Sequence, residues 1–178
     1  IAEAVPRLTG DTYVVELDVP QSSIVFGQPG LPRDDADWYT CLVMNYILGG
    51  GGFSSRLFSE VREKRGLAYS VGTGLHPMRL SALISGGAGT KNANVAESLN
   101  IIRSEWERMR TGGVTADELS RAKSYLTGSF PLRLSSTDRI ARMLVSIQYH
   151  NLGIDYIDKR ANYINVVSAE NIAKLARR

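Results

Sequence analysis

The chain has 178 residues, 43% of them hydrophobic and 22% charged, which suffices for one domain with its own apolar core. No low-complexity tract interrupts it, and this composition excludes an intrinsically disordered chain. Its 21 basic and 18 acidic residues give a net charge of +3 and form no basic cluster, so we expect no nucleic-acid partner. No apolar run reaches the ~18 residues that a membrane span needs.

The first third of the chain predicts two strands and a helix. Residues 13–19 and 22–27 are rich in β-formers and predict strands joined by a turn. Three aspartates, Asp34, Asp35 and Asp37, then suit the positive end of a helix. That helix carries Trp38 and Leu48 on its apolar side and is expected to end at the run Gly49, Gly50, Gly51 and Gly52. Cys41 lies inside it and is interpreted as a small buried hydrophobe.

The middle of the chain predicts a short helix followed by two strands. Residues 54–64 show a helical stripe, with Gly66 as the expected C-terminal cap. Strands are expected at 67–75 and 80–89, joined around His76, Pro77 and Met78. In the first strand one face holds Leu67, Tyr69, Val71, Thr73 and Leu75. Its other face holds only small residues, Ala68, Ser70, Gly72 and Gly74, which indicates a close neighbour.

From residue 91 onward the pattern is helical. A helix over 91–112 is followed by a capping box, Thr115-x-x-Glu118, that opens another helix. Pro131 is expected to end or kink it, and three further helices follow, the last capped by Ser168. The order of elements predicts an α+β fold: a mixed, mostly antiparallel sheet with helices packed on one face.

Zinc-binding chemistry is absent from the pattern. A catalytic zinc needs three protein ligands, usually in a local motif such as H-E-x-x-H or H-x-x-E-H. The two histidines, His76 and His150, are far apart and fit neither motif. We therefore expect no metal site and no cofactor in this chain, and no peptide hydrolysis by this chain alone.

Two glycine clusters raise the alternative of a phosphate-binding module. Residues 86–91 follow a strand and precede a helix, but Thr90 comes before Lys91, the reverse of a P-loop. A turn in which Thr90 caps the next helix is the favoured interpretation. The run from Gly49 to Gly52 leads into a helix N-terminus, a generic anion-binding geometry. Its glycines equally suit the close approach of an extended peptide, or a plain linker.

One segment carries a family resemblance. Residues 55–71 read SRLFSEVREKRGLAYSV, and they resemble the helix-turn-strand signature of pitrilysin/insulinase-type (inverzincin) zinc peptidases. The preceding glycine run and the later Thr115–Lys123 stretch, TADELSRAK, match as well, so the resemblance covers nearly the whole chain. In that family two homologous halves close like a clamp around a chamber, and only the first half carries zinc.

The resemblance implies roles for particular residues. The second, zinc-free half supplies an Arg and a Tyr, seven residues apart, which fall here on Arg62 and Tyr69. Both would contact the substrate carbonyl and its oxyanion, with zinc held by an H-x-x-E-H half in the same chain or in a separate subunit. Gly49, Gly50, Gly51, Gly52 and Phe53 are expected to bind the peptide substrate. The alternatives are a solvated arginine and an ordinary strand tyrosine.

The resemblance also sets expectations for the whole protein. The chain starts at Ile1 and stops at Arg178 within a predicted helix, so we interpret 1–178 as a single-domain fragment whose last strand is missing. An unpaired sheet edge would then favour self-association. A non-catalytic structural core subunit of the same fold is the main alternative. Bacterial versions favour a periplasmic location and leave the cytoplasm open.

Overall fold

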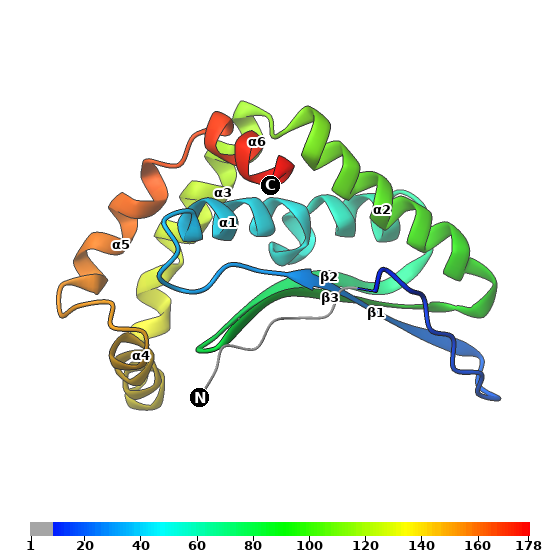
Figure 1. Ribbon diagram of the computed structural model, residues 1–178, viewed down its shortest axis with the longest axis horizontal. Helices are drawn as coiled ribbons and strands as arrows, with labels where there is room; N and C mark the ends of the chain where they lie inside the picture. Colours follow the sequence, from blue (N-terminus) through cyan, green and yellow to red (C-terminus); the bar gives the residue numbers. More distant parts are fainter. Residues whose placement is uncertain (1–8) are drawn as a thin grey trace.

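A computed structural model describes residues 9–178, and it shows a layer of helices on one face of a small sheet, with the helix of residues 137–149 beyond the end of the sheet (Figure 1). The sheet has the order β1-β3-β2, with β1 (Gln21–Pro29), β2 (Ala68–Met78) and β3 (Ser81–Lys91), and both pairings are antiparallel. The helices are α1 (Trp38–Asn45), α2 (Val95–Gly112), α3 (Ala116–Gly128), α4 (Thr137–Tyr149), α5 (Tyr156–Asn165) and α6 (Ala169–Arg177). The predicted α+β fold, with helices on one face, is confirmed.

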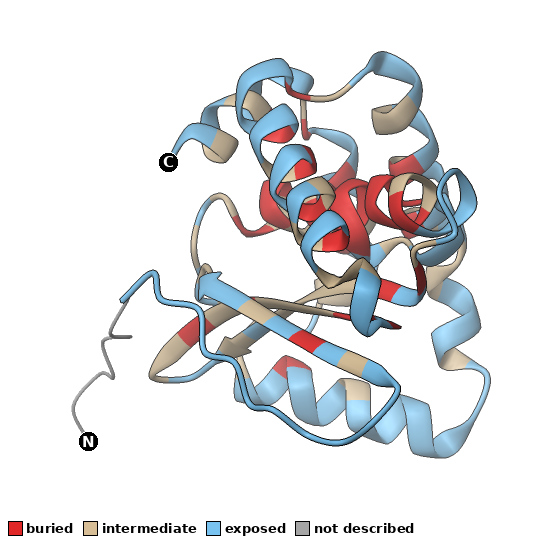
Figure 2. Cartoon of the chain, turned by 90° about the vertical axis from the view of Figure 1, so that its right-hand side faces the viewer, coloured by how far each residue is buried: buried red, intermediate tan, exposed pale blue. Residues whose placement is uncertain are grey.

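The core lies between the sheet and the helices, where Figure 2 places most of the buried residues. Val43 of α1, Leu57 and Val61 are fully buried there, together with Ile164 and Ile172 from the C-terminal helices. Cys41 is 1% exposed, and burial, aided by Asp35 and Asp37, raises the pKa of its thiol to about 12. The interpretation of Cys41 as a small buried hydrophobe is confirmed.

The strand predicted over residues 13–19 is wrong. The structure has an irregular segment there, and Val14 and Val15 are 79% and 81% exposed. High β-propensity measures how well a side chain fits a packed, pleated surface, and this segment has no neighbouring strand to supply one. The second predicted strand is confirmed as β1.

The hairpin turn also differs from the prediction. β2 continues through His76, Pro77 and Met78, and the chain reverses at residues 79–80, since Met78 pairs with Ser81. Pro77 is tolerated because β2 is an edge strand of the sheet, where a missing N–H can face outward without breaking the ladder.

The helical segments around the glycine run are not ordinary α-helix: some are wider π-helical turns and one is a tighter 3₁₀ turn. α1 continues into a π-helical turn, η1 (Tyr46–Gly50), and a 3₁₀ turn, η2 (Gly52–Ser54). The predicted second helix is mainly a π-helical segment, η3 (Phe58–Glu63). Gly66 ends it with φ +63°, and the Leu67 N–H donates to the Val61 carbonyl at 2.9 Å. The predicted Gly66 cap is confirmed.

Three further helix caps were predicted, at Thr115, Ser168 and Thr90, and the structure confirms the first two. Thr115 and Glu118 form the capping box of α3, and Ser168 caps α6. α3 ends before a 3₁₀ turn, η5 (Phe130–Leu134), that contains Pro131. Thr90 does not cap α2: it belongs to β3, and its hydroxyl donates to the Leu67 carbonyl at 2.6 Å.

Candidate functional site

Arg62 lies near the C-terminal end of η3, exposed and stacked on aromatic rings. Its guanidinium carbon lies 4.8 Å from the ring centroid of Phe58 and 5.9 Å from that of Phe53. Among residues 9–178, no carboxylate lies within ion-pair distance of Arg62, whereas the nearby Lys64 and Arg65 both pair with Glu60 at 2.6 Å. The aromatic rings attract the cation, and its N–H donors form no hydrogen bond within residues 9–178.

Phe53 brings the glycine run to the same place. Its ring is 74% exposed and lies edge-on against Phe58, with the centroids 4.6 Å apart. Gly52, immediately before it, has φ +55°, a left-handed conformation that glycine adopts without strain. The structure therefore brings Phe53 close to Arg62, and their binding of a peptide substrate stays a prediction.

Three of the four glycines, Gly49, Gly50 and Gly51, are closely packed against other atoms of the chain, whereas Gly52 has open space around its Cα. A Cβ on Gly49 would lie 2.5 Å from Thr73 Oγ1, and the Gly49 carbonyl lies 3.1 Å from where a Cβ of Gly72 would be. Gly50 and Gly51 are crowded in the same way by atoms of their own turn. A plain flexible linker does not describe this run. The close neighbour predicted for the small face of β2 is therefore found at Gly72.

Tyr69 lies at an irregularity near the start of β2. Ala68 and Ser70 pair with successive residues of β3, so Tyr69 between them is an extra residue, a β-bulge. Its side chain is 58% exposed, while that of Val71 is buried. The predicted shared face of Tyr69 and Val71 is wrong, because strand alternation breaks at the inserted residue. No hydrogen bond joins Arg62 and Tyr69 within the part of the chain that the structure describes.

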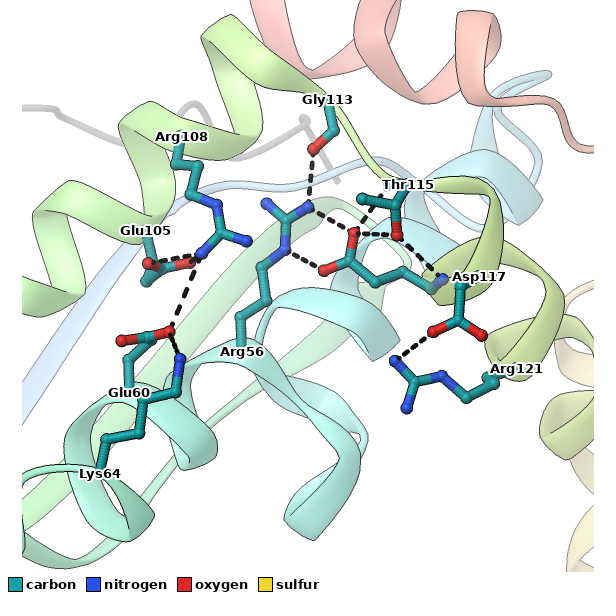
Figure 3. A network of polar contacts seen from close by, with 10 residues as sticks. Arg56, Glu60, Lys64, Glu105, Arg108, Gly113, Thr115, Asp117 and Arg121 are labelled. Atoms are coloured by element: carbon teal, nitrogen blue, oxygen red, sulfur yellow. Dashed lines mark hydrogen bonds and ion pairs between the residues drawn. The ribbon is translucent and has the colours of Figure 1, made fainter.

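A buried ion pair, absent from the sequence prediction, connects the two resembling segments (Figure 3). Arg56 is 7% exposed, and its Nε and Nη2 donate to the two carboxylate oxygens of Glu118 at 2.6 and 2.8 Å. Arg56 Nη2 also donates to the Gly113 carbonyl at 2.8 Å, and Glu118 accepts from the Thr115 N–H at 2.8 Å. Burial acts to raise the pKa of Glu118, but the hydrogen bonds from Arg56 and Thr115 lower it to about 2.

The histidines form no constellation. His76 shares a 2.8 Å hydrogen bond with Ser85, and His150 follows the end of α4 beside the Tyr149 ring. Across residues 9–178, no group of three or more His, Cys, Asp or Glu side chains is arranged to hold a metal ion, so the donors do not fit a zinc site. That the chain binds no zinc stays a prediction. Within the same range, no helix has both the length and the apolar character for a membrane crossing.

Two surface hollows lie away from these residues. One of about 500 Å³ runs along α2 beside Arg103 and Arg108, and one of about 420 Å³ is lined by the stacked Tyr46 and Tyr125 together with Ser54. Neither is lined by Arg62 or Tyr69. Arg62 and Tyr69 are both exposed on the surface of the domain.

Comparison with known proteins decides the family. The model of the peptidase M16 inactive domain matches residues 2–126. The chain belongs to this family. An uncharacterized zinc protease of Streptomyces coelicolor is 40% identical over 131 residues, which are 74% of this chain and 28% of that protein. The crystal structure of a peptidase M16 inactive domain from Pseudomonas fluorescens superposes with a TM-score of 0.83 at 31% identity, over 92% of this chain and 39% of that one.

A third relative bears on activity. A Helicobacter pylori protein named as a non-peptidase homolog is 30% identical over 160 residues, which are 89% of this chain and 37% of that protein. This M16 domain thus spans less than half the length of each of these three relatives. The resemblance to pitrilysin/insulinase-type zinc peptidases, and the assignment to their zinc-free half, are confirmed.

Proposed function

We propose that this domain closes the chamber of a zinc endopeptidase and supplies Arg62 and Tyr69 to the substrate carbonyl. The zinc-bearing half, with its H-x-x-E-H motif, belongs to another part of the same polypeptide or to a partner subunit, and it provides the metal-assisted hydrolysis. The substrate is a peptide. This chain's own contribution is to bind and orient that peptide and to stabilise negative charge on its carbonyl oxygen.

The observation that carries the proposal is the state of Arg62. Its neighbours Lys64 and Arg65 pair with Glu60, whereas Arg62, within residues 9–178, contacts the rings of Phe58 and Phe53 and pairs with no carboxylate. Its guanidinium N–H donors are therefore available to a carbonyl or an oxyanion.

Tyr69 supports the same proposal. The hydrogen-bonded turn from Val61 to Leu67 brings the chain from the end of η3 directly into β2, where the bulge exposes the phenol. The Tyr69 hydroxyl can donate a second hydrogen bond to the same substrate oxygen. Gly50, Gly51 and Gly52 lead to Phe53 beside Arg62, and we propose that this stretch contacts the backbone of the bound peptide, whereas Gly49 is buried against Thr73 and Leu57.

A non-catalytic core subunit of the same fold is the second candidate. It is favoured by the name of the Helicobacter pylori relative, a non-peptidase homolog. The unpaired, exposed state of Arg62 and the exposure of Tyr69 favour the catalytic proposal, since a scaffold has no use for oriented donors on open surface.

The test is kinetic and uses the full-length protein with its zinc-bearing half. Tyr69→Phe removes one donor that acts mainly as charge develops, so we expect kcat to fall about a hundredfold, roughly 3 kcal/mol, with little change in KM. Arg62→Ala should lower kcat as well, and the double variant should lose less than the sum, because both donors serve one oxygen.

Two matched variants control for the substitutions. Tyr149→Phe and Arg142→Ala alter residues on α4 that are 55% and 80% exposed, and they should leave turnover and zinc content unchanged. Normal turnover in both Tyr69→Phe and Arg62→Ala, with folding confirmed by circular dichroism, would leave the domain as scaffold.

A further inference from the structure

The glycine-rich residues 86–91 of β3 have no role in the proposed function, although their sequence raised the alternative of a phosphate-binding turn. Residues 86–91 all lie in β3, so they form no phosphate-binding turn. Two glycines among them instead have an aromatic ring where their side chain would be. A Cβ on Gly86 would overlap the Phe26 ring, and a Cβ on Gly89 would overlap the Tyr69 ring.

The contact at Gly89 involves the reactive end of the tyrosine. A Cβ there would overlap both the phenol carbon and the hydroxyl oxygen of Tyr69, and it would lie 2.8 Å from Cε2. Consecutive residues of a strand face opposite sides of the sheet. Ala88 faces the core, so Gly89 faces the side of the sheet without helices. Gly89 is nevertheless buried. The Tyr69 ring is therefore the group that rests on its Cα.

The bulge and the bare Cα act together. The extra residue in β2 breaks the alternation of side chains between the two faces, and this sets the direction of the Tyr69 side chain. Gly89, paired with Ser70 immediately after the bulge, provides a surface for the ring because it has no side chain. The phenol is thus fixed from β3, across the strand pair, while its other side stays exposed.

We infer that Gly89 is a positioning residue for Tyr69, fixing where the phenol hydroxyl meets the substrate oxygen. The inference rests on the proposed function for its catalytic consequence, but its geometry is independent of that function. The two ring contacts give a reason other than phosphate binding for glycine at these positions: Gly86 accommodates the Phe26 ring and Gly89 the Tyr69 ring. Gly86 differs in kind, because its Cβ would also lie 2.6 Å from the Gly72 carbonyl, so a side chain there strains the sheet itself.

The kinetic test is Gly89→Ala in the full-length protein with its zinc-bearing half. The new methyl group meets only the outer end of a half-exposed ring, which can swing away, so the fold should persist while the hydroxyl moves. A displacement of about 1 Å at a catalytic group can lower turnover about a hundredfold, and we expect kcat to fall to near that of Tyr69→Phe, with KM little changed. Gly89→Ala should cost nothing further in a Tyr69→Phe background.

Gly27→Ala is the matched control. Gly27 lies in β1, on the same helix-free face, and its Cβ would lie 3.4 Å from the nearest atom, an ordinary contact. We expect wild-type turnover from this variant. If Tyr69→Phe is impaired but Gly89→Ala turns over like wild type, the positioning role is wrong while the proposed function stands.

A spectroscopic arm keeps the inference testable if Tyr69→Phe proves fully active and the proposed function fails. In full-length protein labelled at glycine and tyrosine, the Gly89 α-protons should show nuclear Overhauser contacts to the Tyr69 ring. Gly89→Ala should shift the Tyr69 ring resonances, and Gly27→Ala should not. Absence of those contacts in the wild type, or unshifted Tyr69 resonances in Gly89→Ala, overturns the inference whatever the kinetics show.

Discussion

Arginines of one short segment have opposite roles at the residue scale. Arg56 is buried and bound to Glu118, whereas Arg62, six residues later, is exposed and bound to no carboxylate in the described part of the chain. The spacing of the motif could not separate the two, because what distinguishes them is a glutamate 62 positions from Arg56. The capping box at Thr115 was the available signal, since it placed Glu118 at a helix start with oxygens to spare.

The Arg56–Glu118 pair predicts how stability depends on pH. Because the folded-state pKa of Glu118 is lowered from 4.5 to about 2, its contribution is complete above pH 4.5 and is lost as the pH falls toward 2. Solvent screening of this partly exposed carboxylate makes about 3 kcal/mol the upper limit of the contribution. Glu118→Gln should remove this part of the acid dependence, as measured by urea unfolding at about pH 6, above the transition, and at about pH 3, within it.

A neighbouring carboxylate supplies the comparison for Glu118. Asp117 pairs with Arg121, but their side chains are 73% and 69% exposed, and such a surface pair contributes about 1 kcal/mol or less. Asp117→Asn should therefore keep nearly the wild-type acid dependence. Equal pH profiles for Glu118→Gln and the wild type would mean that the buried pair does not stabilise the fold as described.

At the scale of elements, the glycine run is a packing device before it is a binding loop. Gly49 in η1 fits between Thr73 of β2 and Leu57, where a Cβ would lie 2.5 and 2.9 Å from their side chains. We expect Gly49→Ala to destabilise the domain by about 1–3 kcal/mol through overpacking. Gly112→Ala, at the end of α2 with no atom within 4 Å of its Cβ, should be neutral or slightly stabilising in the same urea titration. A Gly49→Ala variant as stable as wild type would contradict this packing.

The same elements show what sequence periodicity can and cannot give. Helical stripes, the Gly66 cap and the Thr115 box predicted where η3 and α3 lie, because these signals are local. The bulge at Tyr69 and the turn after Met78 were missed, because both depend on the register between β2 and β3. The site followed the same rule. Arg62 and Tyr69 were named from the resemblance. The contact of Arg62 with Phe58 is local, within η3, but the contact of Tyr69 with Gly89 crosses from β2 to β3 and depends on the bulge.

At the scale of the molecule, the two edges of the sheet differ. β2 is packed against η1, where Gly49 meets Thr73, but the outer side of β1 pairs with no strand in residues 9–178. β1 carries no charged residue over its nine positions, and Val25 at its centre is 82% exposed. Edge strands that stay single usually carry charges, prolines or bulges along their length to block pairing.

We propose that copies of the purified chain associate through β1, antiparallel to each other about Val25. Val25→Lys would place like charges opposite each other across that pair and should shift the protein toward monomer. Val145→Lys adds the same charge at a 64% exposed site on α4 and should leave association unchanged. Sedimentation velocity over a wide concentration range measures both. A wild-type chain that stays monomeric throughout, or one whose association responds equally to the two lysines, would show that β1 is not the contact.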